Sequence, residues 1–128
     1  MQKHLRSTII IIDDDVQVLR SLCFLLETEG YQVLTFSSAM DLLDHSELPE
    51  SSCLVVDYRM PGMNGIDLMK RMREKYPDVP ALIITGYPDD TIEARAGELG
   101  INVIRKPHLD DALLHGIRDM LPPAEKGT

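Results

Sequence analysis

Three adjacent carboxylates follow a run of four isoleucines in the stretch IIIIDDD, which spans residues 9–15. Adjacent aspartates repel one another, so each makes ionisation of its neighbour more costly unless a cation or a hydrogen-bond donor lies nearby. Asp57, Thr85 and Lys106 likewise stand at or just after the ends of short apolar runs. If the fold gathers these residues, Lys106 and a divalent cation are the positive charges that could offset the carboxylates.

Short apolar runs alternate along the chain with longer segments in which apolar residues recur at helical spacing. The runs are rich in Ile, Val and Leu and are apolar on both faces, which suits strands of a parallel sheet covered by helices on each side. The sequence therefore predicts an α/β fold, a single (βα)5 domain with a central five-stranded parallel sheet and helices on both faces. The expected strands are 8–12, 31–36, 53–56, 81–84 and 101–104.

Polar residues stand at the carboxyl ends of four expected strands, which is where open parallel sheets bind their ligands. Asp13 and Asp14 follow the first strand, Asp57 ends the third, Thr85 ends the fourth and Lys106 follows the fifth. Because these strand ends lie at one edge of the sheet, we expect the side chains to converge there. Three carboxylates at one place form a hard-oxygen site of the kind that Mg²⁺ uses.

Composition and charge restrict the class of protein. A chain of 128 residues with 44% hydrophobic content is long enough for one domain with a buried core. The formal net charge of -8 argues against binding to nucleic acid or to an anionic membrane, since both need clustered Lys and Arg. Cys23 and Cys53 lack metal-ligand spacing, which favours reduced thiols. Without a signal peptide or an apolar run near ~20 residues, we expect a cytoplasmic protein.

Two details of the loops at this edge follow from residue preferences. Asp15 is expected to cap the helix that begins after it, instead of binding a metal, because Asp is favoured at the N-cap and near the positive end of the helix dipole. Pro61 and Gly65 in the stretch MPGMNG shape the loop after Asp57. We expect Gly65 to adopt a backbone conformation that is open only to glycine.

The segments IIDDD, DYRMPGMNG, ITG and RKP occur in this order, each at the end of a different expected strand. Together they resemble the receiver domain of two-component response regulators, over nearly the whole chain. The resemblance implies a flavodoxin-like fold, with residues 1–121 as the receiver domain and 122–128 as a C-terminal tail or the start of a linker. It also implies a signalling phosphoacceptor that catalyses only its own aspartyl phosphorylation and dephosphorylation, and is not otherwise an enzyme.

The same resemblance assigns roles to individual residues. Asp57 would accept a phosphoryl group from the phosphohistidine of a sensor histidine kinase or phosphotransfer protein, or from a small phosphodonor. Asp13, Asp14, Asp57 and the backbone carbonyl of Arg59 would hold Mg²⁺, for which Mn²⁺ could substitute, with Asp13 acting through metal-bound water. The residues that would bind the phosphoryl group and act as the switch are Thr85, Gly86 and Lys106.

The sequence departs from the common pattern of that family three residues before Lys106, where an aromatic switch residue is usual and Val103 stands. Valine has no ring to rotate between buried and exposed positions, so we expect Tyr87, two residues after Thr85, to act as a secondary switch residue. The regulated partner surface is expected to comprise the fourth helix, the fifth strand and the fifth helix. It would serve for dimerisation or for docking an output domain, without direct contact to nucleic acid or membrane.

Proteins of other classes share parts of this pattern. An aspartyl phosphatase of the haloacid dehalogenase type carries DxDx followed by Thr or Val after its first strand, but here Gln17 stands at that last position. A flavodoxin-like electron carrier needs a loop rich in Ser, Thr and Gly to cradle the FMN phosphate, which carboxylates would repel; a colourless purified protein would exclude it. A non-signalling scaffold is a third alternative, against which the complete acidic set argues.

Overall fold

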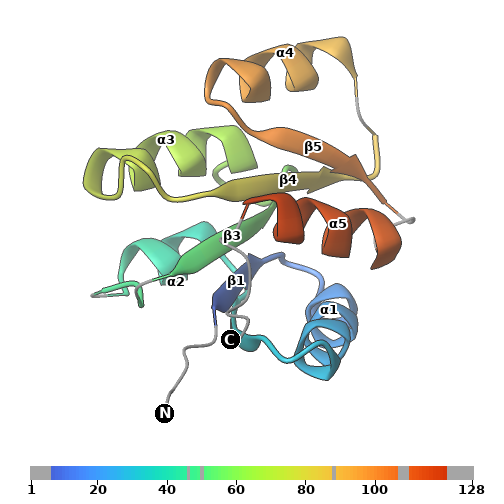
Figure 1. The fold of residues 1–128 in the computed structure, drawn as a ribbon. Coiled ribbons are helices and arrows are strands. Elements are labelled where there is room, and N and C mark those ends of the chain that lie inside the picture. The colour runs from blue at the N-terminus through green and yellow to red at the C-terminus, as the bar shows by residue number, and fades with distance from the viewer. Residues whose placement is uncertain (1–6, 46, 50, 88, 107–109, 121–128) are drawn as a thin grey trace.

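The computed structural model describes residues 7–45, 47–49, 51–87, 89–106 and 110–120, in which strands and helices alternate (Figure 1). The strands are β1 (Thr8–Ile12), β2 (Gln32–Phe36), β3 (Ser52–Asp57), β4 (Ala81–Thr85) and β5 (Asn102–Arg105). The helices are α1 (Val16–Thr28), α2 (Ala39–Leu43), α3 (Gly65–Lys75), α4 (Asp90–Glu98) and α5 (Asp110–Met120). All neighbouring strands pair in parallel, in the order β2-β1-β3-β4-β5. The predicted α/β fold is confirmed.

Helices cover both faces of the sheet, and an apolar core lies on each side (Figure 1). The isoleucine run of β1 serves both cores, because successive side chains of a strand point to opposite faces. Ile9 and Ile11 pack in the core formed with α1 and α5, whereas Ile10 and Ile12 pack in the core formed with α2, α3 and α4. All four are fully buried, so this run must be apolar at every position.

The connections change direction at β1. The chain leaves β1 for β2 on one side and returns to β3 on the other side. The register aligns Ile12 with Val56, so the residues that follow them, Asp13 and Asp57, come side by side at the carboxyl edge. The fold therefore brings together residues separated by more than forty positions in the sequence, at the place where ligands bind in such sheets.

Strands β2 and β5 begin one residue later than the apolar pattern predicts. In each case the first apolar residue of the expected strand takes part in the hydrogen bonds that close the preceding helix. The Tyr31 amide donates to the Leu26 carbonyl at 3.1 Å, and the Ile101 amide donates to the Ala96 carbonyl at 2.9 Å. These bonds satisfy the last carbonyls of α1 and α4 in the Schellman manner. Tyr31 and Ile101 are therefore helix-terminating residues, and β2 and β5 start at the next position.

Candidate functional site

Three predicted carboxylates lie together at the carboxyl edge of the sheet. Oxygen atoms of Asp13, Asp14 and Asp57, one from each carboxylate, lie within 4.8 Å of one another. Asp13 is fully buried and Asp57 is only 5% exposed, whereas Asp14 is exposed. The cluster is thus fixed by the sheet on one side and open to solvent on the other. The donor set, all carboxylate oxygens with one member facing water, fits a magnesium ion that keeps several waters.

Lys106 is the positive charge that pairs with this cluster. Its Nζ lies 3.1 Å from Asp13 Oδ2 and 3.4 Å from Asp57 Oδ1. The Lys106 amide donates to the Thr85 carbonyl at 2.8 Å, which holds the end of β5 against β4. Burial of the ammonium acts to lower the pKa of Lys106, but the hydrogen bond and charge of Asp13, with the charge of Asp57, raise it. Lys106 therefore stays protonated at neutral pH.

The surroundings of Asp57 disfavour the ionised form of its carboxyl group. Its burial, together with the charge of Asp13, raises the pKa of Asp57 from 3.8 to about 6, although Lys106 acts in the opposite direction. An ionised Asp57 is therefore costly to the folded protein, and Lys106 alone does not compensate for it. A divalent cation beside Asp57 would supply the missing positive charge.

Asp57→Asn is expected to stabilise the metal-free protein at neutral pH. Because the pKa of Asp57 is raised on folding, its ionised form destabilises the fold above about pH 6, and this penalty disappears as the pH falls from 6 towards 4. A difference of one in pKa between the folded and the unfolded protein corresponds to about 1.4 kcal/mol of stability. The free energy of unfolding of Asp57→Asn at pH 7.5 should therefore exceed that of the wild type by about 1–3 kcal/mol. Urea unfolding of both proteins, with a chelator present, measures it.

The pH dependence separates this effect from a change in packing. The stability difference between Asp57→Asn and the wild type should shrink between pH 7.5 and pH 4.5. Asp44→Asn, which removes an exposed carboxylate at the end of α2, serves as the matched control and should change stability by less than about 0.5 kcal/mol. An Asp57→Asn protein that is less stable than wild type at pH 7.5 would contradict the electrostatic argument.

Thr85 and the loop that follows it form the second part of the site. Thr85 is fully buried, and its Oγ1 accepts a hydrogen bond from the Tyr87 amide at 3.2 Å. Gly86 is exposed, and a Cβ at this position would meet nothing within 4 Å, so the space beside it is open. Tyr87 is 74% exposed. The Thr85 hydroxyl is thus coupled directly to the backbone of an exposed aromatic residue.

The side chain of Arg59 links the two loops of the site, which the sequence did not reveal. Its guanidinium carbon lies 6.0 Å from the centroid of the Tyr58 ring and 5.9 Å from that of the Tyr87 ring. Both separations are within the range of a cation–π attraction. The sequence predicted a role only for the Arg59 carbonyl, as a metal ligand, and that role stays a prediction. A contact between residues 59 and 87 leaves no periodic signal in a sequence.

Gly65 does not have the glycine-specific backbone conformation expected from the sequence, so that prediction was wrong. Gly65 begins α3, and a Cβ there would lie 2.8 Å from the Asp57 carbonyl oxygen, so the residue is needed for close approach and not for an unusual backbone conformation. The glycine of this loop with a positive φ, +84°, is Gly62.

The expectation for Asp15 is confirmed, because its carboxylate accepts from the Gln17 amide at 2.9 Å and caps α1. Pro107 of the RKP segment lies outside the described residues.

Comparison with known proteins gives a consistent result. The family described as the response regulator receiver domain matches residues 9–118. The transcriptional regulatory protein FixJ of Bradyrhizobium diazoefficiens is 39% identical over 118 residues, which are 91% of this chain and 58% of that protein. The response regulator protein TodT of Pseudomonas putida is 34% identical over 116 residues, 90% of this chain and 51% of that protein. The chain thus spans little more than half the length of these relatives.

Solved structures agree with these matches. A response regulator receiver domain protein from Clostridium thermocellum is 30% identical with a TM-score of 0.82, over 89% of this chain and 93% of that one. The crystal structure titled FixJ-N is 31% identical with a TM-score of 0.79, over 92% of this chain and 93% of that one. The response regulator StyR is 35% identical with a TM-score of 0.82, over 91% and 60% of the two chains.

Proposed function

Because this chain belongs to the response regulator receiver domain family, we propose that it accepts a phosphoryl group on Asp57 and changes its partner-binding surface in response. Receiver domains are signalling domains of response regulators. One observation carries the proposal: three carboxylates and Lys106 meet at the solvent-facing carboxyl edge of the sheet, with Asp57 almost buried between them. Phosphoryl transfer depends mainly on positioning and on neutralising charge, and this arrangement can do both.

Asp57 is the nucleophile in this proposal. One of its carboxylate oxygens forms a bond to phosphorus, while the bond between phosphorus and the donor's leaving atom breaks and the leaving group keeps the electron pair. The Lys106 ammonium, already 3.4 Å from Asp57, moves from the carboxylate to a phosphoryl oxygen. The Thr85 hydroxyl and the Gly86 amide donate to further phosphoryl oxygens.

Asp14 and Asp57, with the Arg59 carbonyl, would hold the magnesium ion, and the buried Asp13 would act through metal-bound water. When bound, Mg²⁺, or Mn²⁺ in its place, neutralises charge on the transferring group and fixes its orientation. Asp13 is already committed on both oxygens, since Oδ1 accepts from the Asp15 amide at 2.9 Å and Oδ2 accepts from Lys106 at 3.1 Å. These two bonds favour the indirect role for Asp13.

Receiver domains interact with kinases and with output domains, and relatives such as FixJ are transcriptional regulators. For this chain we propose a sensor histidine kinase or a phosphotransfer protein as donor.

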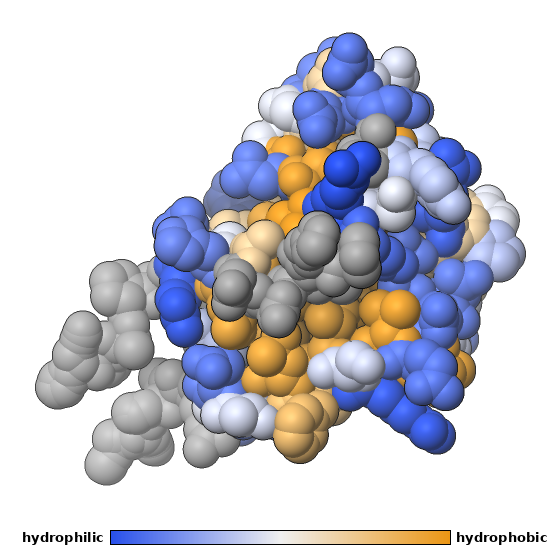
Figure 2. All heavy atoms as spheres, turned by 90° about the vertical axis from the view of Figure 1, so that its right-hand side faces the viewer, coloured by the Kyte–Doolittle hydropathy of each residue, from blue (hydrophilic) through white to orange (hydrophobic). Residues whose placement is uncertain are grey.

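Figure 2 shows hydrophobic residues gathered over part of the face towards which β4 and β5 point in Figure 1, with hydrophilic residues around them. Helix α1 begins directly after Asp15 and carries large exposed apolar residues, Val16 at 53% and Phe24 at 75% exposure, which offer the donor a contact surface.

Location and nucleic-acid binding add little to the assignment. In the part of the chain that the structure describes, no helix is long and apolar enough to span a bilayer. A cytoplasmic location stays a prediction from the sequence, as does the absence of direct contact to nucleic acid.

Lys106→Ala is expected to remove most of the structural response to phosphorylation. The ammonium is the group that can pull the end of β5 towards the phosphoryl group, because it is the cation beside Asp57. The measurement is the shift of amide NMR signals on adding a stable phosphoryl mimic with Mg²⁺. Shifts around Thr85 and along β5 should be large in the wild type and small in Lys106→Ala.

The exposed Lys70 of α3 provides a matched control for this experiment. Lys70→Ala removes the same charge and should respond as the wild type does. If Lys106→Ala shows the full wild-type shifts at Thr85 and along β5, Lys106 has no part in the switch.

The loop after Thr85 is the proposed route from the phosphoryl group to the partner surface. A turn of the Thr85 hydroxyl towards the phosphoryl oxygen would release the Tyr87 amide, which it now accepts from. Tyr87 would then leave Arg59 as the loop moves. Val103 packs half-buried against the core that contains Ile92 and Ala96 of α4, so it holds the helix but cannot swing. The proposed surface comprises α4, β5 and α5.

Tyr87→Ala is expected to weaken phosphorylation-dependent association strongly while leaving phosphoryl uptake unchanged. Val103→Ala should instead lower the stability of the fold, by about 1 kcal/mol, because it removes packing under α4. Association is measured by sedimentation with and without a phosphodonor, and uptake by intact mass. Tyr87→Phe keeps the ring over Arg59 and should behave as the wild type. Association that survives in Tyr87→Ala would show that Tyr87 does not replace the usual aromatic switch.

A further inference from the structure

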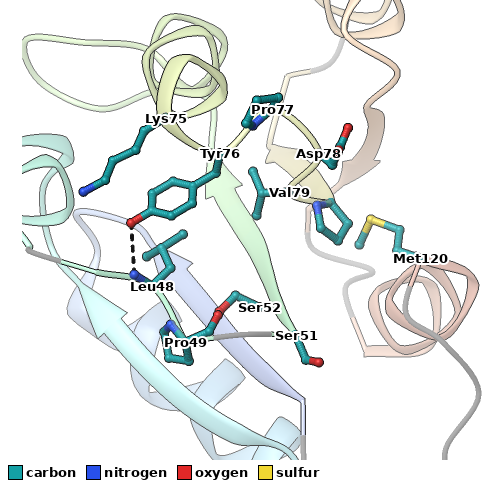
Figure 3. A pocket seen from close by; sticks show the side chains of 11 residues that line it. Leu48, Pro49, Ser51, Ser52, Lys75, Tyr76, Pro77, Asp78, Val79 and Met120 are labelled. Atoms are coloured by element: carbon teal, nitrogen blue, oxygen red, sulfur yellow. Dashed lines mark hydrogen bonds between the residues drawn. The ribbon is translucent and has the colours of Figure 1, made fainter.

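A pocket of about 520 Å³ opens at the amino edge of the sheet, the edge opposite to Asp57. Its walls come from three parts of the chain: the segment before β3, the turn between α3 and β4, and the last turn of α5. Figure 3 shows these parts facing one another, with Pro49 and Ser52 across from Val79 and Met120. The proposed phosphorylation does not use this pocket.

The lining of the pocket includes one aromatic ring, Tyr76, which two contacts hold in place. The Tyr76 hydroxyl accepts a hydrogen bond from the Leu48 amide at 3.1 Å, drawn as a dashed line in Figure 3. The Lys75 ammonium lies over the same ring, 5.4 Å from its centroid. Both contacts fix the tyrosine. Three prolines complete the lining: Pro49, Pro77 and Pro80. Proline-rich, extended peptides bind in grooves lined by aromatic side chains, and the Tyr76 ring is such a side chain here.

The chain itself supplies such a peptide at the edge of the pocket. Met120 lines the pocket, and its side chain points towards Val79 in Figure 3. The next residues, 121–128, read LPPAEKGT and lie outside the described residues. Two adjacent prolines favour the polyproline II conformation, in which eight residues extend about 25 Å. The proline-rich segment therefore starts at the pocket and is long enough to cross it.

We propose that residues 121–124, LPPA, dock in this pocket as a polyproline II segment, with Leu121 and the two prolines against the Tyr76 side. The charges agree with this placement. Lys75 and Asp78, one of each sign, line the pocket, and residues 125 and 126 are Glu and Lys. Docking fixes the direction in which the chain leaves the domain after α5, and so where anything attached after it would sit.

The test is the mobility of the segment, measured as the heteronuclear NOE of backbone amides in the ¹⁵N-labelled chain of residues 1–128. Prolines have no amide, so Leu121 and Ala124 are the reporters. In the wild type, both should be as ordered as the amides of α5. The double variant Pro122→Gly with Pro123→Gly removes the polyproline II preference and changes no residue that lines the pocket. It should make both reporters mobile and shift the amide signals of Leu48 and Val79.

Thr128→Gly is the matched control, because it adds a glycine beyond the docked residues and should change neither reporter. Three results would overturn the proposal. Leu121 and Ala124 could be as mobile as Thr128 in the wild type, or the signals of Leu48 and Val79 could stay unchanged in the double variant. The third result is a dependence of the Leu48 and Val79 amide signals on protein concentration in the wild type. The pocket would then hold the segment of a second copy, which also contradicts docking within one chain.

Discussion

Replacing Asp14 by alanine is expected to abolish magnesium-dependent phosphoryl uptake while leaving the fold intact. Asp14 is the exposed member of the three-carboxylate cluster, whereas Asp13 and Asp57 are buried. Its removal therefore takes one oxygen ligand from the site without opening a cavity. Loss of an outer-shell partner alone typically lowers metal affinity about 10–100-fold, so loss of a direct ligand should lower it by about 100-fold or more.

The measurement combines magnesium titration with phosphoryl uptake from a small phosphodonor. Asp15→Ala is the matched control, since it removes the neighbouring exposed carboxylate and the same charge. It should weaken the cap of α1, at about 1 kcal/mol, and still take up the phosphoryl group. Uptake that proceeds equally well in chelator-treated wild-type protein would show that the carboxylates do not act through a metal.

The convergence of the site could be predicted because it follows from topology alone. Parallel strands end at one edge, so Asp13, Asp57, Thr85 and Lys106 had to meet there once the apolar runs were recognised as strands. The two-sided burial of the isoleucine run follows from the same pattern. Each of these conclusions depends on residue type and order along the chain, which a sequence contains.

Contacts between loops could not be predicted in this way. The sequence shows that Gly65 stands in a special loop, but not whether the reason is its own backbone angle or the nearness of the Asp57 carbonyl. The contact of Arg59 with the Tyr87 ring depends on how two loops approach each other in space. The pocket beside Tyr76 likewise forms from three segments that no motif connects. Such contacts depend on distances between elements, for which composition and periodicity carry no signal.

Membership of the family bears on two of the three alternatives raised by the sequence. The match over residues 9–118 favours a receiver domain over an aspartyl phosphatase or a flavin electron carrier. It does not by itself distinguish a working phosphoacceptor from a scaffold that keeps the fold. The pKa of Asp57, raised to about 6 by burial and by Asp13, argues for a working site, because a scaffold gains nothing from a buried, repelled carboxylate.

Asp57→Asn is expected to eliminate phosphoryl uptake completely. The amide nitrogen and oxygen of asparagine cannot form the acyl phosphate, although the side chain keeps the shape of aspartate and the contacts around it. The same substitution is expected to stabilise the metal-free fold, so loss of uptake cannot be attributed to unfolding. Asp14 and Asp13 remain in place to bind the metal in this variant.

Phosphorylation of Asp57 is therefore tested most directly by the intact mass of the wild type and of Asp57→Asn after incubation with acetyl phosphate and Mg²⁺. The wild type should gain the mass of one phosphoryl group, and Asp57→Asn should gain none. A wild-type protein that gains no mass, or an Asp57→Asn protein that gains the same mass as the wild type, would contradict the assignment of Asp57 as the phosphoacceptor.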